Sequence, residues 1–178
     1  MNKILIVVDM QNDFVTGTLA NPAAEAIIPN IAAKTEQYQR NGDTVVFTRD
    51  THTANYLDTP EGKKLPVSHC IHGTWGWLVV DELNHPECQH IDKRTFGYRD
   101  WQYEDIRCLE EVEEIELVGT CTDICVVSNA MLLKTFYPKV EITVDPSCCA
   151  GVSPESHEAA LTVMKMCQIN VKEDYHCD

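Results

Sequence analysis

The stretch IELVGTCTDICV, residues 115–126, joins a short apolar run to the start of a helical pattern. Residues 115–118 are typical of a buried strand, and residues 122–135 have the periodicity of a helix. A strand that passes through a short turn into a helix is the repeating unit of α/β folds. The stretch also places two cysteines, Cys121 and Cys125, directly after the strand, where a parallel sheet binds its ligands.

The same unit recurs along the chain. Short β-branched runs that suit strands covered on both faces occur at residues 4–8, 44–48, 140–144 and 169–172, with a weaker one at 89–92. Helical patterns cover residues 22–40 and 154–167, the first ending at Asn41–Gly42 and the second opened by Ser153 and Pro154. Alternating strands and helices predict a three-layer α/β/α fold with right-handed crossovers, formed as a single domain over residues 1–178.

The composition narrows the class of protein. Hydrophobic residues make up 44% of the chain, which is typical of a globular protein. The formal net charge of −14 argues against a nucleic-acid partner, because too little positive charge is present to neutralise phosphates. No apolar run is long enough for a membrane span or for the core of a signal peptide. We therefore expect a cytoplasmic protein that binds no membrane and keeps most of its nine cysteines reduced.

Polar groups gather where the expected strands end. Asp9 follows the first strand, Asp50 follows the second, and a long irregular segment, residues 51–76, begins at the same edge. Loops of that length inside a compact domain are commonly functional. Because ligands of open parallel sheets bind outside the carboxyl ends of the strands, this edge is the expected site.

Cys125 is the candidate nucleophile. It lies about one turn into the helix after the strand, where backbone N–H groups lower a thiol pKa and can hold an oxyanion. Cys121 reads as core filler, since buried cysteine usually behaves as a small hydrophobe. Structural zinc is disfavoured because no second pair with ligand spacing lies nearby, and the C-x-x-C spacing of thioredoxin-like sites is absent here.

Asp9 and Lys93 each have a plain and a catalytic interpretation. Asp9 is either a general base or a carboxylate that caps a helix or orders a loop. Lys93 is a solvated surface charge unless a thiolate and a carboxylate lie beside it, in which case it stabilises negative charge.

Taken together, DMQNDF at residues 9–14, Lys93, and GTCTDICV at 119–126 resemble the motifs of the isochorismatase-like cysteine hydrolases, which include the nicotinamidases. The resemblance covers nearly the whole chain in order and spacing. It implies a six-stranded, mostly parallel Rossmann-like sheet and a catalytic triad of Asp9, Lys93 and Cys125. It also implies an oxyanion hole formed by the backbone N–H groups of Cys121 and Cys125, a cis peptide bond between Thr120 and Cys121, and assembly as a homo-oligomer.

The reaction implied by the resemblance is hydrolysis of a small, nicotinamide-like amide to acid and ammonia through a thioester, without an organic cofactor. Hydrolysis of a carbamoyl or ureido compound remains an alternative within enzymes. The vinyl-ether branch of the family characteristically lacks the cysteine, so Cys125 argues against it. A ligand-binding homologue without turnover is the alternative from another class, although an intact reactive set disfavours it.

A metal site is expected at the loop. Asp50, His52 and His69 supply a carboxylate and two imidazoles, which suit zinc, iron or manganese with open positions. By resemblance, such a site in nicotinamidases binds the pyridine nitrogen of the substrate. The family's further histidine is replaced here by Asp58, which leaves Asp58, Glu61 and His72 as alternative fourth ligands.

The aromatic wall for a substrate ring also departs from the family pattern. Nicotinamidases commonly carry Trp-Pro shortly before the second metal histidine, and this chain has Leu65–Pro66. Phe14 and Trp75 are the substrate-binding candidates, with Trp77 as a further aromatic, and Phe14 is favoured because its segment borders Asp9.

Overall fold

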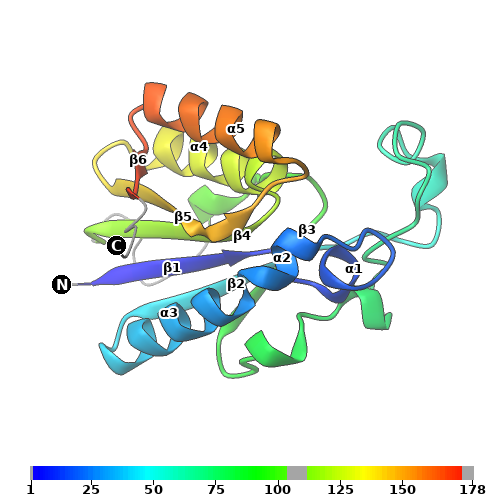
Figure 1. The fold of residues 1–178 in the computed structure, drawn as a ribbon, viewed down its shortest axis with the longest axis horizontal. Coiled ribbons are helices and arrows are strands. Elements are labelled where there is room, and N and C mark those ends of the chain that lie inside the picture. The colour runs from blue at the N-terminus through cyan, green and yellow to red at the C-terminus, as the bar shows by residue number, and fades with distance from the viewer. Residues whose placement is uncertain (1, 104–111, 174–178) are drawn as a thin grey trace.

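The computed structural model describes residues 2–103 and 112–173, and Figure 1 shows a central sheet between two layers of helices. The sheet has six strands in the order β3-β2-β1-β4-β5-β6, and every strand pair in it is parallel. The strands are β1 (Lys3–Val8), β2 (Thr44–Asp50), β3 (Gln89–Lys93), β4 (Glu114–Thr120), β5 (Glu141–Ala150) and β6 (Asn170–Val171). The expected α/β/α architecture is confirmed, and the sheet is wholly rather than mostly parallel.

The helices divide between the two faces. In Figure 1, α2 (Pro22–Ala26) and α3 (Ile28–Arg40) cover one face, and α4 (Val127–Phe136) and α5 (Pro154–Met166) cover the other. The short helix α1 (Asn12–Val15) lies at the carboxyl ends of the strands, beside the loop that leaves β2. In the same view, that loop extends away from the body of the domain.

Two helix predictions need correction. The expected single helix over residues 22–40 divides at Ile27 into α2 and α3, because Pro29 lies in the first turn of α3. Proline lacks the N–H that an uninterrupted helix needs there, and its ring clashes with the carbonyl four residues earlier. The expected helix over residues 122–135 begins instead as a π-helical turn, Thr122–Val126, and becomes α-helical only at Val127. The prediction for α5 is confirmed: Ser153 caps it by accepting a hydrogen bond from the N–H of Ser156.

Alternating side chains of the strands build one apolar layer on each face. Ile4, Ile6 and Val8 of β1 belong to the cluster that packs against α4 and α5, whereas Leu5 and Val7 belong to the cluster against α3. β1 is almost fully buried, as a central strand of a covered parallel sheet must be. Among residues 2–103 and 112–173, no helix is long and apolar enough to cross a membrane.

A buried polar cluster ties α3 to the sheet near the amino end of β4. Glu116 is only 1% exposed and accepts hydrogen bonds from Tyr38 at 2.5 Å, Lys34 at 2.6 Å and Lys172 at 2.8 Å. Lys34 also pairs with Asp145 at 2.7 Å. Charged groups in such a location are stable only when they are paired, so the cluster constrains how α3 and the chain after β6 pack.

Candidate active site

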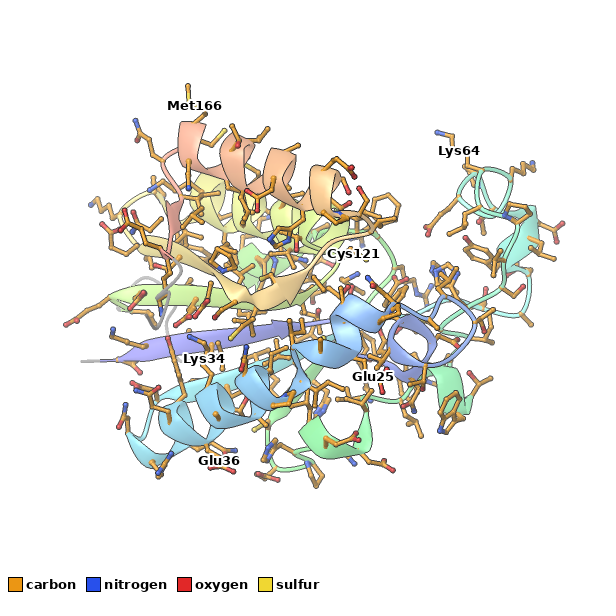
Figure 2. The ribbon with its side chains drawn as sticks, in the orientation of Figure 1. Glu25, Lys34, Glu36, Lys64, Cys121 and Met166 are labelled. Carbon is orange, nitrogen blue, oxygen red and sulfur yellow. The ribbon has the colours of Figure 1, made fainter. Side chains whose placement is uncertain are left out.

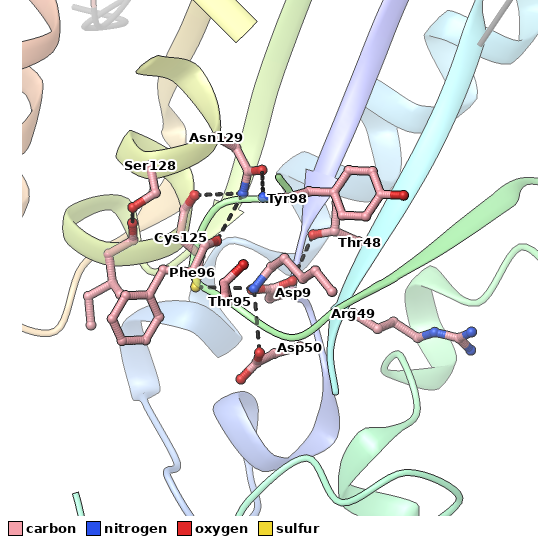
Figure 3. A network of polar contacts seen from close by, with 12 residues as sticks. Asp9, Thr48, Arg49, Asp50, Thr95, Phe96, Tyr98, Cys125, Ser128 and Asn129 are labelled. Carbon is pink, nitrogen blue, oxygen red and sulfur yellow. Dashed lines mark hydrogen bonds and ion pairs between the residues drawn. The ribbon is translucent and has the colours of Figure 1, made fainter. Parts of the chain in front are cut away.

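Four polar side chains meet at the carboxyl edge of the sheet because four consecutive parallel strands deliver them there. Asp9 follows β1, Asp50 and Lys93 are the last residues of β2 and β3, and Cys125 lies in the π-helical turn after β4. Asp50 is the register partner of Lys93. Figure 3 shows Asp9, Asp50 and Cys125 gathered at these strand ends. Lys93, expected just beyond its strand, is therefore held by it.

Lys93 is at the centre of this group. Its Nζ lies 2.6 Å from Asp9 Oδ2, 3.6 Å from Asp50 Oδ1 and 3.5 Å from Cys125 Sγ. Lys93 is 1% exposed and Asp9 is fully buried. Thr48 donates a hydrogen bond to the other carboxylate oxygen of Asp9 at 2.7 Å. The plain interpretation of Lys93 as a solvated surface charge is therefore wrong.

Burial and the lysine act in opposite directions on the protonation of these groups. Burial raises the pKa of Asp9 above its ordinary value, and the charge of Lys93 offsets only part of that rise. Burial also raises the pKa of the Cys125 thiol, again against the attraction of Lys93, and a hydrogen bond to Asp9 favours the neutral thiol further. Burial disfavours the ammonium of Lys93, but Asp9, Cys125 and Asp50 outweigh it and raise the pKa of Lys93. The resting arrangement is thus a thiol beside an aspartate of raised basicity and a fixed cation.

The turn that carries Cys125 follows a tightly packed exit from β4. Gly119 has φ of +115°, a region that side chains rarely adopt, and a Cβ there would lie 2.2 Å from the carbonyl oxygen of Val8. The peptide bond between Thr120 and Cys121 is cis, as the family resemblance implied. Cys121 precedes the first residue of the turn, so its backbone and that of Cys125 lie at a helix start, where N–H groups lack intrahelical partners.

A second cluster lies next to the first and shares Asp50 with it. Asp50, His52, Glu61 and His69 each offer one ligand atom, and these atoms all lie within 4.8 Å of one another. His52 Nε2 is 2.9 Å from Asp50 Oδ2 and 3.7 Å from Glu61 Oε1, and His69 Nε2 is 3.6 Å from Asp50 Oδ2. His69 Nδ1 lies 2.8 Å from the carbonyl of Val67, which orients the ring with Nε2 toward the cluster.

The structure distinguishes among the candidate fourth ligands. Glu61 belongs to the cluster, whereas Asp58 is exposed on the loop and His72 contacts the ring of Trp77, with 4.7 Å between ring centroids. Four inward-facing N and O donors, three of them buried, fit the ligand preferences of zinc, iron or manganese.

The aromatic candidates differ in position. The ring of Phe14 is half-buried, and its centroid lies 5.6 Å from that of His69, beside the putative ligand cluster's inner edge. Trp75 is 59% exposed, and the contact recorded for it is through its carbonyl, which accepts from Asn12 Nδ2 at 2.9 Å. Trp77 donates its ring N–H to Thr51 at 2.9 Å. Phe14 is thus the aromatic that borders both clusters.

Sequence reasoning missed two side chains that hold the cluster residues in place. Gln11 accepts from the N–H of Asp50 at 2.7 Å and donates to its carbonyl at 2.9 Å. Asp13 accepts from the N–H of Cys70, the neighbour of His69, at 2.7 Å. Both belong to DMQNDF, and their polarity directly after a buried strand was the available signal.

Comparison with known proteins agrees with this geometry. The isochorismatase domain family matches residues 3–172. The chain therefore belongs to the isochorismatase family, and it is a nicotinamidase-like hydrolase of that family.

Its relatives are similar over almost their whole length. It is 27% identical to the nicotinamidase of Saccharomyces cerevisiae, an alignment covering 95% of this chain and 98% of the relative. The crystal structure of nicotinamidase PncA from Bacillus subtilis superposes with a TM-score of 0.84 at 29% identity, covering 97% of this chain and all (100%) of that one. The pyrazinamidase of Pyrococcus horikoshii, solved in complex with zinc, superposes with a TM-score of 0.85 at 27% identity, covering 98% and 100% of the two chains.

Proposed function

We propose that this protein is a cysteine-dependent amidohydrolase that cleaves a small, nicotinamide-like amide to the carboxylic acid and ammonia. The observation that carries the proposal is the buried chain of contacts from Asp9 through Lys93 to Cys125, with separations of 2.6 Å and 3.5 Å. A thiol, a base of raised pKa and a fixed cation in one buried site are the components of nucleophilic acyl transfer.

The first half-reaction acylates Cys125. Its sulfur attacks the amide carbonyl carbon while Asp9, whose pKa burial has raised, accepts the thiol proton. Lys93 stabilises the negative charge that develops on sulfur, and the backbone N–H groups of Cys121 and Cys125 hold the oxyanion. Asp9 then returns the proton to the leaving nitrogen, the C–N bond breaks, and ammonia departs from a thioester.

The second half-reaction releases the acid. Asp9, again ionised, takes a proton from a water molecule as that water attacks the thioester carbonyl. The C–S bond breaks, the carboxylic acid leaves, and the proton returns to the sulfur of Cys125. The sum is one amide and one water converted to one acid and one ammonia.

Asp50, His52, Glu61 and His69 would hold a divalent metal beside this site. When bound, such a metal would supply an open coordination position that orients a nitrogen or oxygen donor of the substrate. The chain's own contribution is to place this position next to the thiol, because Asp50 contacts Lys93 at 3.6 Å. Phe14, against His69, would form one wall for a flat substrate ring.

The test is ammonia release from a panel that contains nicotinamide, pyrazinamide, and small aliphatic, carbamoyl and ureido compounds, each with and without zinc, iron or manganese. Cys125→Ala is the inactive control, and Cys167→Ala, at an exposed cysteine, is the matched control that keeps activity. Release from nicotinamide that is lost in Cys125→Ala supports the proposal.

Turnover of carbamoyl or ureido compounds alone would replace the substrate class while keeping the nucleophile. This second class is favoured by the exposure of Trp75, which leaves the ring wall to Phe14. Turnover that persists in Cys125→Ala would refute the mechanism.

A further inference from the structure

Lys93 and Cys125 are not held together by the sheet itself. In the strand order β3-β2-β1-β4-β5-β6, the strand that ends in Lys93 is at one edge, and two strands separate it from β4, which leads to Cys125. Their contact of 3.5 Å therefore depends on how the chain after β3 is joined to the turn after β4.

The loop after β3 is seated directly on α4. Gly97 approaches the helix so closely that a Cβ would lie 2.6 Å from Leu132 Cδ1 and 3.3 Å from the carbonyl carbon of Ser128. Thr95 donates a hydrogen bond to the carbonyl of Gly97 at 2.7 Å, which shapes the turn at this contact. Close packing brings the loop to the helix, and polar contacts are needed to set its register.

Asn129, on α4, provides those contacts and is fully buried. Its Nδ2 donates to the carbonyls of Cys125 at 2.8 Å and Phe96 at 3.2 Å. Its Oδ1 accepts from the N–H of Tyr98 at 2.8 Å and from Trp101 Nε1 at 2.9 Å. Figure 3 shows Asn129 between Cys125 on one side and the segment of Phe96 and Tyr98 on the other. Both amide hydrogens and both acceptor positions of this side chain are therefore in use.

We propose that Asn129 is a positioning residue for the proposed amide hydrolysis, which links the chain after Lys93 to the turn of Cys125 and so fixes the separation of cation and nucleophile. The inference rests on the proposed function for its kinetic consequence. Asn129 binds the main chain on both sides of the gap, and a single amide contacts both segments. A buried amide with every hydrogen bond satisfied has one favourable orientation, so it transmits little freedom from one segment to the other.

Asn129→Leu tests the link because leucine has a similar size and makes no hydrogen bond. A displacement of about 1 Å between reacting groups costs about 10²-fold in rate. We expect kcat to fall about 10- to 100-fold, with KM changed by less than about threefold, since the amide of Asn129 is engaged by the protein and not by the site's open side. Asn129→Thr keeps a hydroxyl that can bond the carbonyl of Cys125 and lacks the contacts to the loop, so the same loss of kcat is expected for it.

Ser128→Ala is the matched control. Ser128 lies on the same helix and also donates to a carbonyl four residues earlier, that of Ile124 at 2.6 Å, but this bond does not reach the loop. Its substitution is expected to leave kcat and KM within about twofold. Thermal unfolding of each variant shows that it is folded, and if Asn129→Leu fails to fold, Asn129→Thr decides.

The rate at which iodoacetamide modifies Cys125 at a fixed pH gives a readout that needs no substrate. It is expected to fall several-fold in both Asn129 variants, because Lys93 no longer stabilises the thiolate from its place. A folded Asn129 variant with wild-type kcat and wild-type modification rate would overturn the inference, as would equal losses in Ser128→Ala. If the wild-type protein releases no ammonia from any compound, the proposed function fails, and the modification rates still decide the role of Asn129.

Discussion

Replacing Lys93 by methionine removes the charge at the centre of the site while keeping an unbranched side chain of similar length. The lysine is 1% exposed and its Nζ lies 2.6 Å from Asp9 and 3.6 Å from Asp50. Both carboxylates are buried, so neither can turn to water when its partner is lost. Lys93→Met therefore leaves uncompensated negative charge in the interior.

The magnitude follows from that loss. Breaking a buried ion pair by removing one partner costs about 3–5 kcal/mol of unfolding free energy. At about 2–4 °C per kcal/mol for a chain of this size, the melting temperature is expected to fall by roughly 6–20 °C near neutral pH. Activity is expected to be lost as well, because the developing charge on Cys125 loses its counter-ion.

The pH dependence of this cost has a definite sign. Burial already raises the pKa of Asp9, and without Lys93 that pKa rises further. A group whose pKa is raised in the folded state stabilises it fully below the unfolded pKa, and this contribution is lost as pH rises through the folded pKa. The destabilisation by Lys93→Met is therefore smallest in acid and grows by up to about 1.4 kcal/mol per pH unit toward neutral pH.

Urea unfolding of both proteins at a series of pH values, in the presence of a chelator, measures this difference. Lys3→Met is the matched control, because Lys3 pairs with Glu114 at 2.6 Å but its side chain is 37% exposed, and at most about 1 kcal/mol is expected. Adding Asp9→Asn to Lys93→Met should remove most of the pH dependence. A cost of Lys93→Met that is independent of pH, or largest in acid, would refute the reasoning.

Three further substitutions address the base, the metal and the scaffold. Asp9→Asn is expected to lower kcat about 10²- to 10⁴-fold in steady-state assays, since a base is lost, and a change within tenfold would exclude Asp9 from that role. Glu61→Gln is expected to weaken zinc binding about 10- to 100-fold in competition with a chromogenic chelator. Asp58→Asn, on the same loop but outside the cluster, should leave zinc affinity unchanged, and equal weakening in both would contradict the assignment. Glu116→Ala is expected to cost about 3–5 kcal/mol in urea unfolding, because Lys34 loses a buried partner, and a cost below about 1 kcal/mol would show that the polar cluster contributes little.

Much of the fold could be predicted because its signals are local. Short β-branched runs followed by helical patterns identified the strands of a covered parallel sheet, and the carboxyl-edge rule then placed Asp9, Asp50 and Cys125 together. The division between α2 and α3 was also readable in principle, since Pro29 is incompatible with an unbroken helix. The π-helical turn at Thr122–Val126 was not, because a π-helical turn and an α-helix place apolar residues in nearly the same pattern over five residues.

The remainder of the site depends on contacts between distant segments. Glu61 was one of three open alternatives for the fourth ligand, and only the path of the loop brings it to His52. Gln11 acts through the backbone of Asp50, and Asn129 through four partners spread over 34 residues of the sequence from Phe96, a set that no spacing rule connects. Buried amides of this kind carry no periodic signal, since their role is defined by the main-chain groups they meet.

The central claim is that Cys125 carries the acyl group of an amide substrate. The most direct measurement is peptide mass spectrometry of the protein quenched in acid during turnover of nicotinamide, with Cys125→Ala treated in parallel. The account predicts a nicotinoyl group on the peptide that contains Cys125 and no such adduct in the variant. Turnover without any adduct on Cys125, or an adduct on another cysteine that forms and decays at the rate of turnover, would contradict it.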